Sequence, residues 1–130
     1  MDYRFSTELK DGYLHVRVFG PNDVPTTRRY VEDVIAACTR EDCPNVLIEE
    51  NLEGERLSLG EIFGVLSEKD REIRAAIQLS AFVDVNPRRI LSNQVFAEDV
   101  AVNRGIPIRY FATVPQAEQW LREKLGHSAR

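Results

Sequence analysis

Polar and apolar residues alternate through the first twenty positions of the chain. Apolar side chains fall at every second position in two runs, Tyr3, Phe5 and Leu9 and then Leu14, Val16 and Val18. A period of two is typical of β-strands that bury one face. Asp11-Gly12 lies between the runs and favours a tight turn. The pattern therefore predicts an opening hairpin with strands over 3–9 and 13–19.

The spacing of apolar residues changes to three and four after this hairpin. The apolar positions are Val24, Tyr30, Val31, Val34, Ile35 and Cys38. This spacing predicts an amphipathic helix that begins with Asp23 or Thr26 as its cap. A short apolar run at 46–48 then predicts a strand covered on both faces. Residues 51–57 are polar and predict a loop.

The second half of the chain continues this alternation of helix and strand. Ser58 and Glu61 match a capping box, so a helix is predicted to begin at Ser58. Residues 75–83 predict a fourth strand, and Asn86-Pro87 favours the start of another helix. A fifth strand is predicted over 106–110, where Pro107 favours an edge position.

A second capping box, Thr113 with Gln116, predicts the last helix. The element order is then β-β-α-β-α-β-α-β-α. This order predicts an α/β fold with a mixed five-stranded sheet and about four helices. We expect one domain over 1–126 and a C-terminal tail over 127–130.

Composition fits an ordinary globular domain of 130 residues, with 43% hydrophobic and 29% charged residues. The net charge of −4 argues against nucleic-acid binding, which concentrates Lys and Arg. No apolar run approaches the roughly 20 residues that span a bilayer, and the first residues lack an apolar stretch, so we expect neither a transmembrane segment nor a signal peptide. We therefore expect a cytoplasmic protein.

The residues that usually carry catalysis or bind metal are scarce. The chain has two histidines, and His15 is expected on the sheet surface, so a histidine triad or a multi-histidine metal site is implausible. Cys38 and Cys43 are expected to be free thiols. Phosphate-binding glycine motifs are absent as well. We expect no cofactor, no metal and no enzymatic activity.

Polar residues gather where the predicted parallel strands end, the edge at which open α/β sheets bind ligands. The candidates are Arg28, Arg29, Glu50, Ser58, Asp84, Arg88 and Arg89. The two arginine pairs lie near helix N-termini, where a cation opposes the helix dipole and favours a neighbouring anion. That anion is either a ligand group or a glutamate of the same chain, namely Glu49, Glu50, Glu53 or Glu55. Pairing within the chain is the simpler interpretation.

Two of these candidates allow more than one interpretation. Ser58 is either a helix cap or a phosphorylation site, and the capping box accounts for both Ser58 and Glu61. Glu50 and Asp84 end neighbouring predicted strands, and paired carboxylates perform acid–base work only if their environments separate their pKa values. Nothing in the sequence indicates such a separation.

An apolar pocket between two predicted helices is a further hypothesis. Its lining would be Ile62, Phe63, Leu66, Phe96 and Val100. Ordinary core packing explains the same residues, since periodicity does not reveal concavity. Gly60 and Gly64 weaken the helix that carries the first three.

Three stretches resemble STAS domains, and in particular their SpoIIAA-like (STAS/SEC14) branch. They are LHVRVFG at 14–20, FAEDVAVNRGI at 96–106, and IRYFAT at 108–113 followed by AEQWL at 117–121. The element order is also that of STAS domains. In the antagonist branch a phosphorylatable serine lies in an Asp-Ser-Ser-Gly context, whereas this chain has Arg-Leu-Ser-Leu-Gly-Glu at 56–61.

The resemblance implies a non-enzymatic interaction or regulatory module that binds a protein partner or a second copy of itself. A carrier or sensor of a small hydrophobic or anionic ligand is the alternative that it leaves open. An uncharacterised enzyme is the third possibility, and no catalytic constellation in the residues supports it.

Overall fold

A computed structural model describes residues 3–54, 57–85 and 108–126. Five strands form one sheet in the order β1-β2-β3-β4-β5. Their bounds are Arg4–Leu9 for β1, Leu14–Pro21 for β2, Asn45–Glu53 for β3, Leu79–Asp84 for β4 and Ile108–Phe111 for β5. β1 is antiparallel to β2, and each later strand is parallel to the strand before it. The predicted mixed five-stranded sheet is confirmed.

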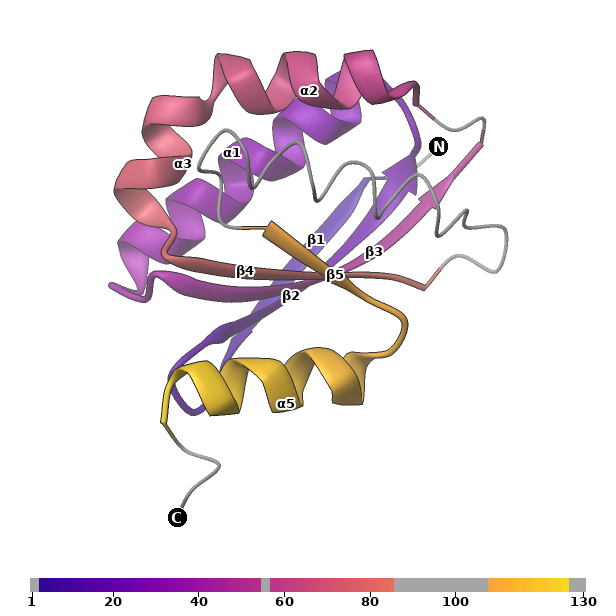
Figure 1. Cartoon of the computed structure of the whole chain (residues 1–130). Helices are drawn as coiled ribbons and strands as arrows, with labels where there is room; N and C mark the ends of the chain where they lie inside the picture. The colour runs from indigo at the N-terminus through magenta and orange to yellow at the C-terminus, as the bar shows by residue number, and fades with distance from the viewer. Residues whose placement is uncertain (1–2, 55–56, 86–107, 127–130) are drawn as a thin grey trace.

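Helices cover both faces of this sheet (Figure 1). Their bounds are Val24–Arg40 for α1, Leu59–Glu68 for α2, Asp70–Ala76 for α3 and Val114–Lys124 for α5. Figure 1 shows α1, α2 and α3 on one face and α5 on the other. The predicted tail over 127–130 and the helix predicted after Asn86-Pro87 lie outside the described residues.

Capping contacts confirm the predicted starts of α1, α2 and α5. The Asp23 side chain accepts a hydrogen bond from the backbone N–H of Thr26 at 2.8 Å, which identifies Asp23 as the cap of α1. Ser58 and Glu61 form both hydrogen bonds of a capping box at the start of α2. The Thr113 hydroxyl accepts from the backbone N–H of Gln116 at the start of α5. Each cap satisfies a backbone donor that has no partner within its helix.

Two predicted boundaries were wrong. Residues 51–53 belong to β3 and pair with β2, although their polar side chains predicted a loop. Residues 75 and 76 belong to α3, which the sequence interpretation missed, and β4 begins only at Leu79. Ile73 and Ile77 are both buried and lie four positions apart, which is a helical spacing.

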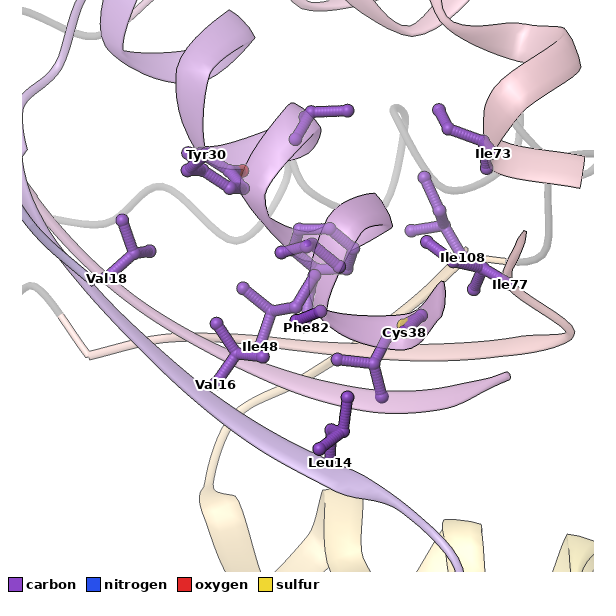
Figure 2. Packing of buried hydrophobic residues seen from close by; sticks show 14 of the residues in the cluster. Leu14, Val16, Val18, Tyr30, Cys38, Ile48, Ile73, Ile77, Phe82 and Ile108 are labelled. Carbon is purple, nitrogen blue, oxygen red and sulfur yellow. The ribbon is translucent and has the colours of Figure 1, made fainter. Parts of the chain in front are cut away.

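The larger hydrophobic core lies between the sheet and α1, α2 and α3, and we call it the first core cluster. Figure 2 shows part of it, with labelled side chains Leu14, Val16, Val18, Tyr30, Cys38, Ile48, Ile73, Ile77, Phe82 and Ile108. The alternating residues of β2 that predicted a buried face supply three of them. Cys38 is also buried in this cluster, as the sequence predicted.

A smaller cluster lies under α5, which packs against β3, β4 and β5. Its fully buried members include Leu47, Ala81 and Leu121. On this same face β1 and β2 expose charged side chains, among them Arg4 and Arg17. Helices therefore cover both faces of the sheet at β3, β4 and β5. At β1 and β2, exposed charged side chains lie on the face that carries α5.

Candidate functional site

Glu50 and Asp84 lie side by side where β3 and β4 end. The two residues are direct partners in the β3–β4 register, as their predicted positions implied. They follow Ile48 and Phe82 by two positions, so they lie on the face that carries the first core cluster. The hydroxyl of Tyr30, from α1, donates a hydrogen bond to the Glu50 carboxylate. Helix α1 thus closes one side of this carboxylate pair.

Tyr30 is a site residue that sequence reasoning missed. It is buried, and this burial raises the pKa of its phenol well above the usual value, with a further contribution from the negative charge of Glu50. Tyr30 therefore remains a hydrogen-bond donor across the physiological pH range. Its place on the apolar stripe of a helix was the available signal, because a buried tyrosine hydroxyl requires a partner.

The structure does not place Arg28 and Arg29 against the carboxylate pair. Arg28 donates through Nε to Glu68 at 2.8 Å, at the far end of α2. The guanidinium of Arg29 lies 4.2 Å from the centre of the Tyr3 ring. Pairing within the chain is thus correct for Arg28, but Glu68 is not among the glutamates that the sequence suggested. Arg88 and Arg89 lie outside the described residues.

Ser58 is an exposed helix cap. Its hydroxyl accepts from the backbone N–H of Glu61 at 3.1 Å, and the Glu61 carboxylate accepts from the backbone N–H of Ser58 at 2.9 Å. This reciprocal arrangement gives the serine a structural role without any modification.

Replacing Ser58 by alanine should lower the free energy of unfolding by about 0.5–2 kcal/mol, because a backbone donor at the start of α2 loses its acceptor. Ser58→Asp is the matched control, since aspartate is an equally good cap and its charge suits a helix N-terminus. Urea unfolding followed by circular dichroism measures both. Equal losses in the two variants would show that the hydroxyl has a role other than capping.

His15 is buried, which corrects its expected position on the sheet surface. Its side chain points to the α5 side of the sheet, and Nε2 lies 2.8 Å from Oε1 of Glu49. Arg17 also approaches Glu49, at 3.7 Å. The alternation of β2 correctly predicted the face on which His15 lies. It did not predict the contact with Glu49, because Glu49 belongs to the neighbouring strand β3.

A small cavity lies in the first core cluster, beside part of the predicted apolar pocket. A cavity of about 30 Å³ is bounded by Tyr30, Leu66, Ile73, Phe82 and Ile108, among others. Ligand pockets usually enclose about 300–1,000 Å³, so this cavity is too small for a lipid-like molecule. Of the predicted lining, Leu66 borders it.

The structure describes only two of the other four residues predicted to line this pocket. Ile62 and Phe63 pack against the first core cluster. Phe96 and Val100 lie outside the described residues. The hypothesis of a pocket lined by all five residues therefore stays a prediction.

Neither a metal site nor a reactive thiol is evident among the described residues. Within residues 3–54, 57–85 and 108–126, no three His, Cys, Asp or Glu side chains are grouped as metal ligands would be. Cys38 and Cys43 are buried free thiols, and burial raises the pKa of Cys38 to about 11. A thiol with so high a pKa stays protonated and is a weak nucleophile.

No helix in the described part of the chain combines the length and the apolar character that crossing a membrane requires.

Comparison with known proteins identifies proteins of similar structure but none of similar sequence. The sequence matches no family model, and no curated protein matches it significantly. The structure is similar to an anti-sigma factor antagonist from Mycobacterium paratuberculosis, with a TM-score of 0.58 and 17% identity over 93% of this chain and 95% of that chain. It is also similar to the anti-sigma factor antagonist SpoIIAA in its unphosphorylated form, with a TM-score of 0.51 and 15% identity over 92% and 98%. The chain therefore has the STAS-type fold of these antagonists.

Proposed function

We propose that this protein is a non-enzymatic regulatory module that acts by binding a protein partner. The observation that carries the proposal is the match of nearly the whole chain to structures of anti-sigma factor antagonists. Those proteins are named for opposing another protein. No described side-chain arrangement in this chain offers a competing catalytic role, and Tyr30 and Ser58 both have structural partners.

We assign the partner-binding surface to the exposed face of α2. Gly60 and Gly64 lie four positions apart on this helix and are both exposed. A Cβ atom added at Gly64 would meet nothing within 4 Å, and one added at Gly60 would meet only the Ser58 hydroxyl at 3.9 Å. The fold itself therefore does not require glycine at either position.

Each of these glycines nevertheless weakens the helix, by up to about 1 kcal/mol relative to alanine. A bare helix face allows the backbone of a partner to approach closely, which explains why glycine is useful there. The capping box of Ser58 fixes the start of the same face. The surface then consists of the exposed part of α2 from Ser58 to Gly64.

Gly64→Arg tests this assignment, because the added side chain projects into open space and blocks the face without disturbing the core. Affinity capture from cell extract, with mass spectrometry, should identify a protein retained by the wild type. Calorimetry with that purified protein should then show at least about a tenfold loss of affinity for Gly64→Arg, as for a blocked interface centre. The variant itself should be at least as stable as the wild type, because arginine is a better helix former than glycine.

Arg71→Glu is the matched control, since it changes an exposed residue on α3. It should retain the partner with unchanged affinity. Binding that survives Gly64→Arg would move the surface away from α2. A chain that retains no protein under any condition would contradict the proposed function.

A further inference from the structure

Strand β1 forms one edge of the described sheet. In the described sheet β1 pairs with β2 alone. The backbone N–H of Lys10 donates to the carbonyl of Tyr13 at 2.8 Å, so this pair is hydrogen-bonded. Hydrogen-bonded pairs recur at every second position of an antiparallel ladder. The backbone groups of Phe5, Thr7 and Leu9 therefore point away from β2, toward the open edge.

One large hydrophobic side chain of this edge strand is exposed. Leu9 is 57% exposed, although it is a large hydrophobic residue at the end of β1. Arg4 and Glu8 are also exposed and lie on the opposite face of the strand. An open edge with exposed apolar residues is a ready template for pairing with another strand.

We propose that β1 pairs antiparallel with β1 of a second copy of this chain, about a twofold axis at Ser6, so that two sheets become one continuous ten-stranded sheet. This register places Phe5 opposite Thr7 of the second copy. It places Arg4 opposite Glu8 of the second copy, and by symmetry Glu8 opposite the other Arg4. Extended by one residue, it sets Leu9 opposite Tyr3.

The backbone pattern fits this register. Phe5 and Thr7 both direct their backbone groups outward, so they form a hydrogen-bonded pair across the new interface. Arg4 and Glu8 then form a pair without hydrogen bonds, in which the facing side chains come closest. Opposite charges at such positions stabilise strand pairing, and the twofold axis supplies the contact twice.

Neighbouring registers are less favourable. A shift of two residues in one direction places Arg4 opposite Lys10 of the second copy, which brings like charges together. A shift in the other direction places Arg4 opposite Ser6 and removes the ion pair. The sequence of β1 is thus most self-complementary when Ser6 lies on the axis.

The face of β1 beneath α1 has room for the incoming side chains. A groove of about 460 Å³ runs along it, with Phe5 and Thr7 from β1 and Arg29 and Asp33 from α1 among its lining residues. A twofold axis perpendicular to the sheet keeps the same face upward in both copies. Leu9 of the second copy therefore enters at the end marked by Tyr3 and loses its exposure to water.

This register pairs seven residues of each copy, from Tyr3 to Leu9, which is a small interface, so we expect a dimer in the micromolar range rather than an obligate one. It uses neither α2 nor the carboxylate pair, and it is independent of the proposed function.

Sedimentation velocity over a concentration series tests the pairing. The wild type should dimerise as its concentration rises. Arg4→Glu and Glu8→Arg should each weaken the dimer by at least about tenfold, because each places like charges across the edge twice. An equimolar mixture of the two variants should dimerise again, since every mixed contact restores opposite charges. Arg71→Glu, an exposed charge reversal on α3, should behave as the wild type.

Three results would overturn the proposal. The wild type could stay monomeric at every concentration, which would leave the edge to a strand of a different protein. The single variants could dimerise as well as the wild type. The mixture could fail to recover although circular dichroism shows both variants folded, which would exclude the contact between Arg4 and Glu8.

Discussion

Replacing Leu14 by alanine should remove about 2–5 kcal/mol from the free energy of unfolding. Leu14 is 1% exposed and belongs to the first core cluster. Its truncation loses buried apolar contacts and leaves a cavity that the surrounding side chains fill only in part. Domains of this size are stable by about 5–15 kcal/mol, so the loss is a large fraction of the total. Urea unfolding should show a lower midpoint with an unchanged slope.

Leu9→Ala is a matched control, because Leu9 is the direct partner of Leu14 in the β1–β2 register. The same substitution at this exposed position should change the free energy of unfolding by no more than about 0.5 kcal/mol. The protein should be dilute, so that self-association does not contribute. Similar losses in the two variants would contradict the difference in burial between Leu14 and Leu9.

Tyr30→Phe should cost about 1–3 kcal/mol at neutral pH, because it removes the hydrogen bond that the buried Tyr30 hydroxyl donates to the partly buried Glu50 carboxylate. Tyr13→Phe is the comparison. The Tyr13 hydroxyl donates to Glu118 of α5 at 2.7 Å. Helix α5 lies at the surface, so a water molecule can donate to Glu118 in place of this hydroxyl. Its loss should be about 0.5–1.5 kcal/mol. Equal effects would show that Glu50 finds a substitute donor.

Tyr30 should also make the protein sensitive to alkali. Its pKa is raised in the folded state, whereas in the unfolded chain it titrates near its ordinary value of 10.0. The folded state therefore holds this proton more tightly, and the stability that Tyr30 contributes is complete below pH 10 and is lost as the pH rises above it. The free energy of unfolding, measured at a series of pH values up to about 11, should decrease less steeply with pH for Tyr30→Phe than for the wild type. Parallel curves would contradict the buried, protonated state of Tyr30.

Local sequence patterns predicted those features that depend on near neighbours. The alternation of β2 gave its buried face through Leu14, Val16 and Val18, because side-chain direction has a period of two in any strand. The caps at Asp23 and Ser58 followed from short side chains that reach a backbone donor three positions on. The element order, together with the three stretches that resemble STAS domains, indicated the STAS-type fold.

Features that depend on distant segments could not be predicted in this way. Residues 51–53 at the end of β3 are mostly polar, yet their backbone pairs with β2. Hydrogen bonds between backbones do not require particular side chains, so the sequence did not indicate this pairing. Arg28 pairs with Glu68 because α2 packs against α1, a matter of tertiary arrangement. The buried His15 forms a hydrogen bond with Glu49, which lies 34 positions away in the chain. The contact between Tyr30 and Glu50 likewise joins two elements, α1 and β3, that are separated in the sequence.

The strands occur in the sheet in the order in which they occur in the chain. During synthesis, every strand therefore emerges from the ribosome after the strand that it must join. The hairpin of β1 and β2 needs only a short turn, and each later strand extends an edge that already exists. Such a sheet can grow in one direction while translation continues, as expected for a chain that folds from its N-terminus. Until β5 joins, the growing edge stays unpaired, and this is the stage at which aggregation is the greatest risk.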